Sequence, residues 1–237
     1  MAVITQLRKL ISQGALQAAL LLAVLGCAEA APLPCVAGVE AERLAAMSPP
    51  PPPDPADDDD YRHHLRATAY GWPRRDHWCV WIEPVSAEGP ASRWDLAWRQ
   101  AVEAALISWA GLVPITLVDH QEQAQVLIQR RRPPLRGGRA SHGRAELSLV
   151  MMRRQGEPQL EPLVTVQISP GQRPEAMQAT ALHELGHAFG LWGHSKAAGD
   201  AMAAVPGASP VLKLSPRDRA TFLWLQQQPG LGPAPTP

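Results

Sequence analysis

Two histidines and a glutamate stand at a spacing that suits a metal site. His183 and His187 are four residues apart, with Glu184 between them, in the segment HELGH. Four residues make slightly more than one helical turn, so on a helix both imidazoles lie on one face and can bind one ion, with the carboxylate beside them. A zinc site that keeps one position open for water needs three protein ligands. The motif therefore predicts a metal site that requires one more residue.

His194 is the candidate for the third ligand. The helix that carries the motif is predicted to stop at Gly190, because glycine accepts the positive φ of a turn without a Cβ clash. His194 follows four residues later, within reach of the same ion. The alternative is that His194 is a surface histidine and that the site lacks its third ligand.

The segment HELGHAFGLWGHS, with Met202 beyond it, resembles the metzincin metallopeptidases and, among them, the matrixin-like branch. The resemblance implies Zn²⁺ as cofactor and hydrolysis of peptide bonds by metal-activated water. It also implies an edge strand, residues 146–151, that aligns a polypeptide substrate in extended form. The implied site comprises the zinc ligands His183, His187 and His194, the general base Glu184, and Met202 as the methionine under the metal.

The spacing departs from the family signature HExxHxxGxxH at one point. Gly193 occupies the eleventh position, and His194 is the twelfth. Met202 lies eight residues after His194, as the resemblance implies, so the extra residue belongs to the turn at residues 190–193. Deletion of Trp192 would restore the commoner spacing, and we expect it to be tolerated better than replacement of His194.

The elements that must position these residues indicate an α+β fold. Short apolar runs between Arg, Gly and Pro clusters predict five strands. They lie at residues 77–83, 115–118, 124–129, 146–151 and 163–169. With the resemblance, this predicts a metzincin-like domain: a mixed five-stranded sheet, a long backing helix, an active-site helix, a methionine turn and a C-terminal helix.

Three helices are predicted from periodicity and caps. The first begins at an apparent capping box, Ser92 to Asp95, and ends before Gly111. Its core stripe consists of Trp98, Val102, Ala105 and Trp109. The second runs over residues 174–189. The third begins at Ser215, which is an N-cap serine followed by proline at the first helical position.

The flanking segments predict export. Residues 1–30 have Arg8 and Lys9, an apolar run at 15–25 and a small-x-small site before residue 31, as in a signal peptide. A lipidated Cys27 or an uncleaved anchor are the alternatives. Residues 31–69 are predicted as a Pro/Asp-rich linker or pro-segment, 70–228 as the zinc metallopeptidase domain and 229–237 as a disordered tail. The location would be periplasmic, extracellular or membrane-anchored.

The cysteines leave two questions open. Once Cys27 leaves with the signal, Cys35 and Cys79 are either joined in a disulfide or both free. Cys35 also faintly resembles the cysteine that masks zinc in matrixin zymogens. The residues around it do not match that motif, so we expect a plain or disulfide-bonded cysteine.

The charge balance bears on which classes of partner the protein can bind. Formal net charge is zero, with 22 basic and 22 acidic residues, which disfavours nucleic acid. Contact with a membrane is expected only through the N-terminal segment, and a monomer is the simplest oligomeric state. The expected function is an exported zinc-dependent endopeptidase. The alternative is a non-catalytic zinc-binding interaction module that retains the fold.

Overall fold

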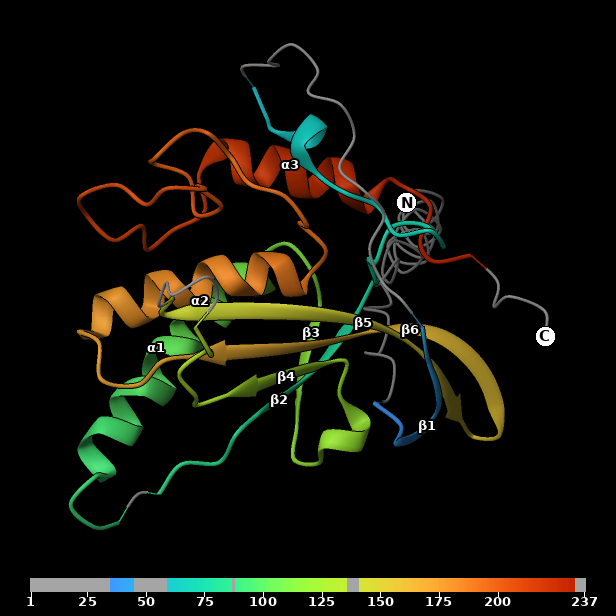
Figure 1. Ribbon diagram of the computed structural model, residues 1–237, viewed down its shortest axis with the longest axis horizontal. Coiled ribbons are helices and arrows are strands. Elements are labelled where there is room, and N and C mark those ends of the chain that lie inside the picture. The colour runs from blue at the N-terminus through green and yellow to red at the C-terminus, as the bar shows by residue number, and fades with distance from the viewer. Residues whose placement is uncertain (1–34, 45–58, 87, 136–140, 233–237) are drawn as a thin grey trace, which may run out of the picture. The chain divides into compact units, whose positions relative to one another are not determined.

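A mixed sheet of six strands organises the fold of the computed structural model, which describes residues 35–44, 59–86, 88–135 and 141–232 (Figure 1). The strand order is β1-β5-β6-β4-β2-β3. Strand β5 is antiparallel to both of its neighbours, and the remaining pairs are parallel. The strands are β1 (Gly38–Leu44), β2 (Trp78–Ile82), β3 (Ile115–Val118), β4 (Val126–Gln129), β5 (Gly143–Arg154) and β6 (Glu157–Ile168). All five predicted strands are present, and β1 is an additional strand.

Strand β1 corrects two expectations. The sheet has six strands rather than five, and β5 is not an edge strand along its whole length, because β1 pairs with residues 149–154. No described strand pairs with residues 143–148 on the side away from β6. The sequence GVEAERL was not recognised as a strand because its side chains are exposed or half-buried. Its apolar alternation is limited to Val39 and Ala41, and pairing with β5 holds it in place.

Within the described residues there are three α-helices, α1 (Ser92–Ala110), α2 (Pro174–Ala188) and α3 (Pro216–Gln226). Two short 3-10 turns, η1 (Arg62–His64) and η2 (Gln121–Gln123), precede β2 and β4 respectively. Helix α1 packs against α2, and α2 lies along β5 and β6 (Figure 1). The predicted core stripe of α1 is confirmed, because Trp98, Val102, Ala105 and Trp109 are buried. The two indole N–H groups donate to backbone carbonyls, Trp98 to Ile168 at 3.2 Å and Trp109 to Leu182 at 3.0 Å.

The start of α3 agrees with the prediction from the sequence, and the start of α1 differs from it. Ser215 caps α3, and Asp218 completes a capping box with it. The capping box predicted at the start of α1 is absent: Ala91 is the N-cap and makes no side-chain cap bond. Asp95 forms an ion pair with Arg130 at the end of β4 instead, which a local pattern could not reveal.

The described parts of the predicted linker and tail belong to the fold. Cys35 is bonded to Cys79, and Tyr61 and Leu65 are buried, so the folded unit extends N-terminal of residue 70. At the other end, Gly232 donates to the Tyr70 carbonyl at 2.7 Å. The predicted signal peptide, most of the Pro/Asp run and residues 233–237 lie outside the described residues.

Among the residues described, no helix has both the length and the apolar character that a membrane span requires.

Candidate functional site

Helix α2 positions three of the predicted site residues on one turn. Its start follows the sequence, with Pro174 at the first helical position. Leu182 and Leu185 are fully buried in the core, which fixes the rotation of the helix about its axis. His183 and His187 then lie next to each other, with ring centroids 4.9 Å apart.

The end of α2 turns back sharply at Gly190. The Leu191 N–H donates to the Gly186 carbonyl at 2.9 Å and the Gly190 N–H to the His187 carbonyl at 3.0 Å, as in a glycine-terminated helix. Gly190 has φ +111°, which a side chain would strain. Two tight bonds follow, from Trp192 N–H to the Gly190 carbonyl at 2.9 Å and from Gly193 N–H to the Leu191 carbonyl at 3.0 Å. These bonds accommodate the extra residue.

The turn rests on the segment around η1. The Arg66 N–H donates to the Trp192 carbonyl at 2.8 Å. A Cβ on Gly193 would lie 2.0 Å from the His64 carbonyl oxygen, so only glycine fits there. The Trp192 ring lies nearly parallel to the His187 ring, at 5.4 Å and 18°. Residues 64–66 therefore help to bring His194 back towards α2.

The three predicted histidines converge. The ligand atoms of His183, His187 and His194 all lie within 4.8 Å of one another. The Nε2 atoms of His187 and His194 are 3.2 Å apart. Two nitrogens bound to one tetrahedral zinc at about 2.0 to 2.1 Å would be roughly 3.3 to 3.4 Å apart. The group could hold one metal ion.

Backbone carbonyls orient two of the rings. Nδ1 of His183 lies 2.8 Å from the Ala201 carbonyl oxygen, and Nδ1 of His187 lies 2.7 Å from that of Leu191. A carbonyl only accepts, so each Nδ1 carries the proton and each Nε2 keeps its lone pair. This is the tautomer that a metal ligand needs, and it places both free lone pairs at the meeting point of the three rings.

Glu184 lies beside this point in a buried position. Its side chain is 9% exposed and accepts a hydrogen bond from the Ala145 N–H of β5. Burial raises the pKa of Glu184 to about 8, against the opposing effects of that hydrogen bond and of Arg144. A carboxyl group in this state can hold and transfer a proton near neutral pH.

Burial lowers the pKa values of the three imidazoles, in contrast to that of Glu184. Desolvation lowers the pKa of His183, and it lowers that of His187 well below the usual value. Partial burial, with His183 and Arg66 nearby, lowers the pKa of His194 to about 4. All three rings are therefore neutral at physiological pH, which is the form that binds metals.

Met202 lies under α2, held by a carboxylate that the sequence did not single out. Met202 is fully buried, and a Cβ on Gly186 would lie 2.2 Å from its Sδ atom. Asp218 accepts from the N–H groups of Ala201 at 2.8 Å and Met202 at 3.3 Å. The Tyr61 hydroxyl donates to the same carboxylate at 2.8 Å. The role of Asp218 was not predicted, because its distant partners leave no local signal.

A cleft of about 380 Å³ adjoins the site. His183 and Glu184 form part of its wall, together with Gly143 from β5 and residues 203–204 and 206–211 after Met202. Small neutral side chains such as Ala179, Ala203 and Ala204 predominate among the other lining residues. The cleft offers space for a ligand directly beside the histidines and the carboxyl group.

Cys35, His77 and Cys79 form a second group of possible metal ligands, but two of the three are bonded to each other. The two cysteines form a disulfide, which answers the question left open by the sequence and leaves Cys35 without a free thiol. Nδ1 of His77 lies 4.0 Å from Cys79 Sγ. A disulfide removes both thiolates that a metal would need, so the histidine group is the stronger candidate.

No family model matches the chain, and no curated protein matches it.

Proposed function

We propose that the protein is an exported zinc endopeptidase of metzincin-like fold, and that the convergence of three neutral imidazoles beside a buried glutamate carries this function. Three nitrogen donors within 4.8 Å of one another, two of them 3.2 Å apart, suit zinc better than calcium or magnesium, which prefer oxygen ligands. In this proposal His183, His187 and His194 hold the ion. The Cys35–Cys79 disulfide supports an oxidising compartment outside the cytoplasm.

The chemistry requires little beyond these residues. When bound, zinc lowers the pKa of a coordinated water to about 7 and polarises a carbonyl. The nearby positive charge would also lower the pKa of Glu184, whose carboxylate then takes the proton of the water. Glu184 afterwards delivers that proton to the leaving amine. No covalent bond between enzyme and substrate is needed.

The substrate in this proposal is an extended polypeptide. Residues 143–148 of β5 keep a side without a described strand partner, and β5 begins at the cleft. A peptide can add to such a strand by main-chain hydrogen bonds, which are independent of its sequence. The order of α2, the buried Met202 and α3 along the chain supports the metzincin-like assignment.

The test combines metal analysis with cleavage assays on the purified protein. We expect about one zinc per chain, and cleavage of an unstructured substrate such as casein that a chelator stops and added zinc restores. Glu184→Gln should keep the zinc and lose activity by about a hundredfold or more, because it removes the proton carrier and no ligand. His194→Ala should weaken zinc binding sharply.

Two outcomes would redirect the proposal. Bound zinc without cleavage of any unstructured substrate would favour the non-catalytic zinc-binding module. Unchanged zinc affinity in His194→Ala would remove His194 from the ligand set.

A further inference from the structure

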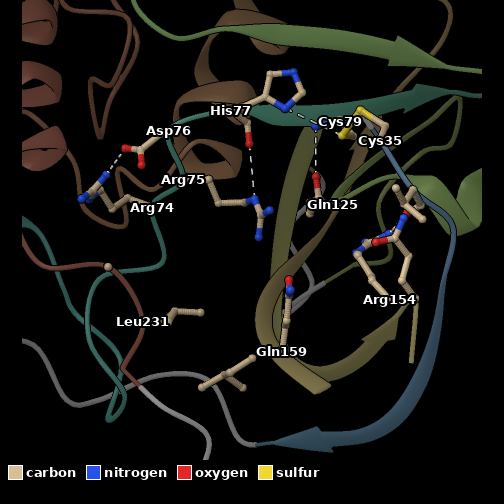
Figure 2. A pocket seen from close by; sticks show the side chains of 14 residues that line it. Cys35, Arg74, Arg75, Asp76, His77, Cys79, Gln125, Arg154, Gln159 and Leu231 are labelled. Atoms are coloured by element: carbon tan, nitrogen blue, oxygen red, sulfur yellow. Dashed lines mark hydrogen bonds and ion pairs between the residues drawn. A yellow bond between two sulfur atoms is a disulfide. The ribbon is translucent and has the colours of Figure 1, made fainter. Parts of the chain in front are cut away.

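A pocket of about 550 Å³ opens beside the Cys35–Cys79 disulfide (Figure 2). We call it the disulfide pocket. It shares no lining residue with the cleft. Its wall includes Cys35, Cys79, Arg75, Arg154, Gln159 and Leu231.

Arg75 contributes a guanidinium group that is only loosely held (Figure 2). Its Nε donates to the His77 carbonyl at a long 3.3 Å. Its one ion pair among the described residues is with Glu161, and the nearest atoms, NH1 and Oε2, are 3.9 Å apart. The side chain is 29% exposed, so the other guanidinium donors have access to the pocket.

Glu161 cannot fully balance this charge, because it is already engaged. Arg154 donates to both of its carboxylate oxygens, at 2.8 and 3.0 Å, and the Gln125 amide donates at 3.2 Å. The Arg154–Glu161 pair is therefore neutral by itself. Arg74, on the pocket wall, is likewise paired with Asp76.

Among the described residues, the pocket thus carries one guanidinium charge in excess, beside three uncharged amide side chains and an apolar wall. Gln125, which is bonded to Glu161, and Gln155 and Gln159 provide the amides, and Leu160 and Leu231 provide the apolar part. A partly desolvated cation whose carboxylate partner is 3.9 Å away and already paired is incompletely compensated, and a bound anion would complete that compensation.

We propose that the disulfide pocket binds a small organic carboxylate through the guanidinium group of Arg75. A planar fork of N–H donors matches a carboxylate bidentately. One negative charge balances the single excess positive charge, whereas a phosphate dianion would leave one charge uncompensated. The leucine side chains favour a carboxylate attached to an apolar body. This site is independent of the metal site and of peptidase activity.

The test is calorimetric titration of the purified full chain with benzoate at constant ionic strength. Benzamide, which has the same shape without the charge, and inorganic phosphate serve as comparison ligands. We expect one benzoate site and no detectable binding of benzamide. Arg75→Gln should weaken benzoate binding about tenfold or more, because the bidentate pair is lost. Arg99→Gln is the control: it removes the same charge from a side chain outside the pocket lining, so it should bind benzoate as the wild type does.

Equal binding of benzoate to wild type and Arg75→Gln would overturn the site. Tighter Arg75-dependent binding of phosphate would overturn the carboxylate assignment. If Arg75→Gln does not fold, NMR of the wild type decides. Benzoate should shift the ring protons of His77, which lines the pocket, and leave those of His120 unchanged. Shifts at both rings or at neither would contradict the proposal.

Discussion

Met202 owes its position to a residue without a side chain. At Gly186 a Cβ would lie 2.2 Å from Met202 Sδ and 3.1 Å from Cζ2 of Trp109. We predict that Gly186→Ala lowers the free energy of unfolding by about 1 to 3 kcal/mol through overpacking. Helix propensity alone would favour alanine by about 1 kcal/mol, so a loss of stability must come from the core.

Urea denaturation measures this effect, and Gly199→Ala is the control. A Cβ at Gly199 meets nothing within 4 Å, so its stability should stay within about 0.5 kcal/mol of wild type. If Gly186→Ala were as stable as wild type, Met202 would not occupy the position described.

The histidine pKa values predict how zinc binding couples to protons. At pH 6, three imidazoles with the ordinary pKa would release roughly two protons when zinc binds. His183, His187 and His194 have lowered pKa values, that of His194 being about 4, so they should release fewer. Glu184→Gln removes the nearby carboxyl group, whose pKa is about 8. Calorimetry of this variant in buffers of different ionisation enthalpy should find fewer protons than this, and a value of two or more would contradict the shifts.

The same shifts give the sign of an acid effect on the metal-free protein. Between pH 6.5 and about 4, the unfolded chain takes up protons at His194 that the folded chain does not. This histidine therefore favours unfolding increasingly as pH falls through that window. Above pH 6.5 both states are unprotonated at His194 and its effect disappears.

The turn after α2 decides whether His194 reaches the other histidines. The Trp192 ring stacks on His187, while its buried Nε1 has no hydrogen-bond partner among the described residues. The Trp192 side chain therefore contributes through ring packing and not through a hydrogen bond. We predict that Trp192→Phe keeps zinc affinity and that Trp192→Ala weakens it about three- to tenfold, in line with the strength of aromatic pairs.

Deletion of Trp192 should be far more damaging to zinc affinity than its replacement by phenylalanine or alanine. The deletion removes the carbonyl that accepts from Arg66 N–H and displaces Gly193 from its contact with the His64 carbonyl. Metal titration of the three variants provides the comparison. A deletion variant with wild-type zinc affinity would show that residues 64–66 do not brace the turn.

These elements also show which features of the fold and the site a local sequence pattern can predict. The spacing of His183 and His187 predicted their common helix, and apolar runs predicted five strands, because both signals lie within one element. Strand β1 was missed because its side chains are exposed or half-buried and its register depends on pairing with β5, which lies more than 100 residues further along the chain. The partners of Asp218 were missed for another reason: the Tyr61 hydroxyl comes from 157 residues away, and no local pattern encodes such a contact.

Across the whole molecule, the site depends on long-range ties rather than on α2 alone. The hydrogen bond between Tyr61 and Asp218 joins the segment around η1 to α3, and Asp218 in turn holds the backbone at Met202. Trp109 of α1 packs on Phe189 at 5.8 Å and on Phe222 at 5.3 Å. The histidine cluster should therefore be lost together with the fold, in one cooperative transition.

The disulfide and strand pairing that attach β1 to the rest of the fold predict what happens when the backbone is cleaved after β1. Leu44 pairs with Leu149 in β5 and Cys35 is bonded to Cys79, while Tyr61 is anchored at Asp218. A nick at a protease recognition sequence introduced within residues 45–58 would therefore leave a two-chain protein joined covalently. We predict one band on a gel without reductant and two bands with it. Cys79→Ser removes the covalent link, so its nicked form should give two bands under both conditions; loss of the N-terminal fragment from the nicked wild type without reductant would contradict the disulfide.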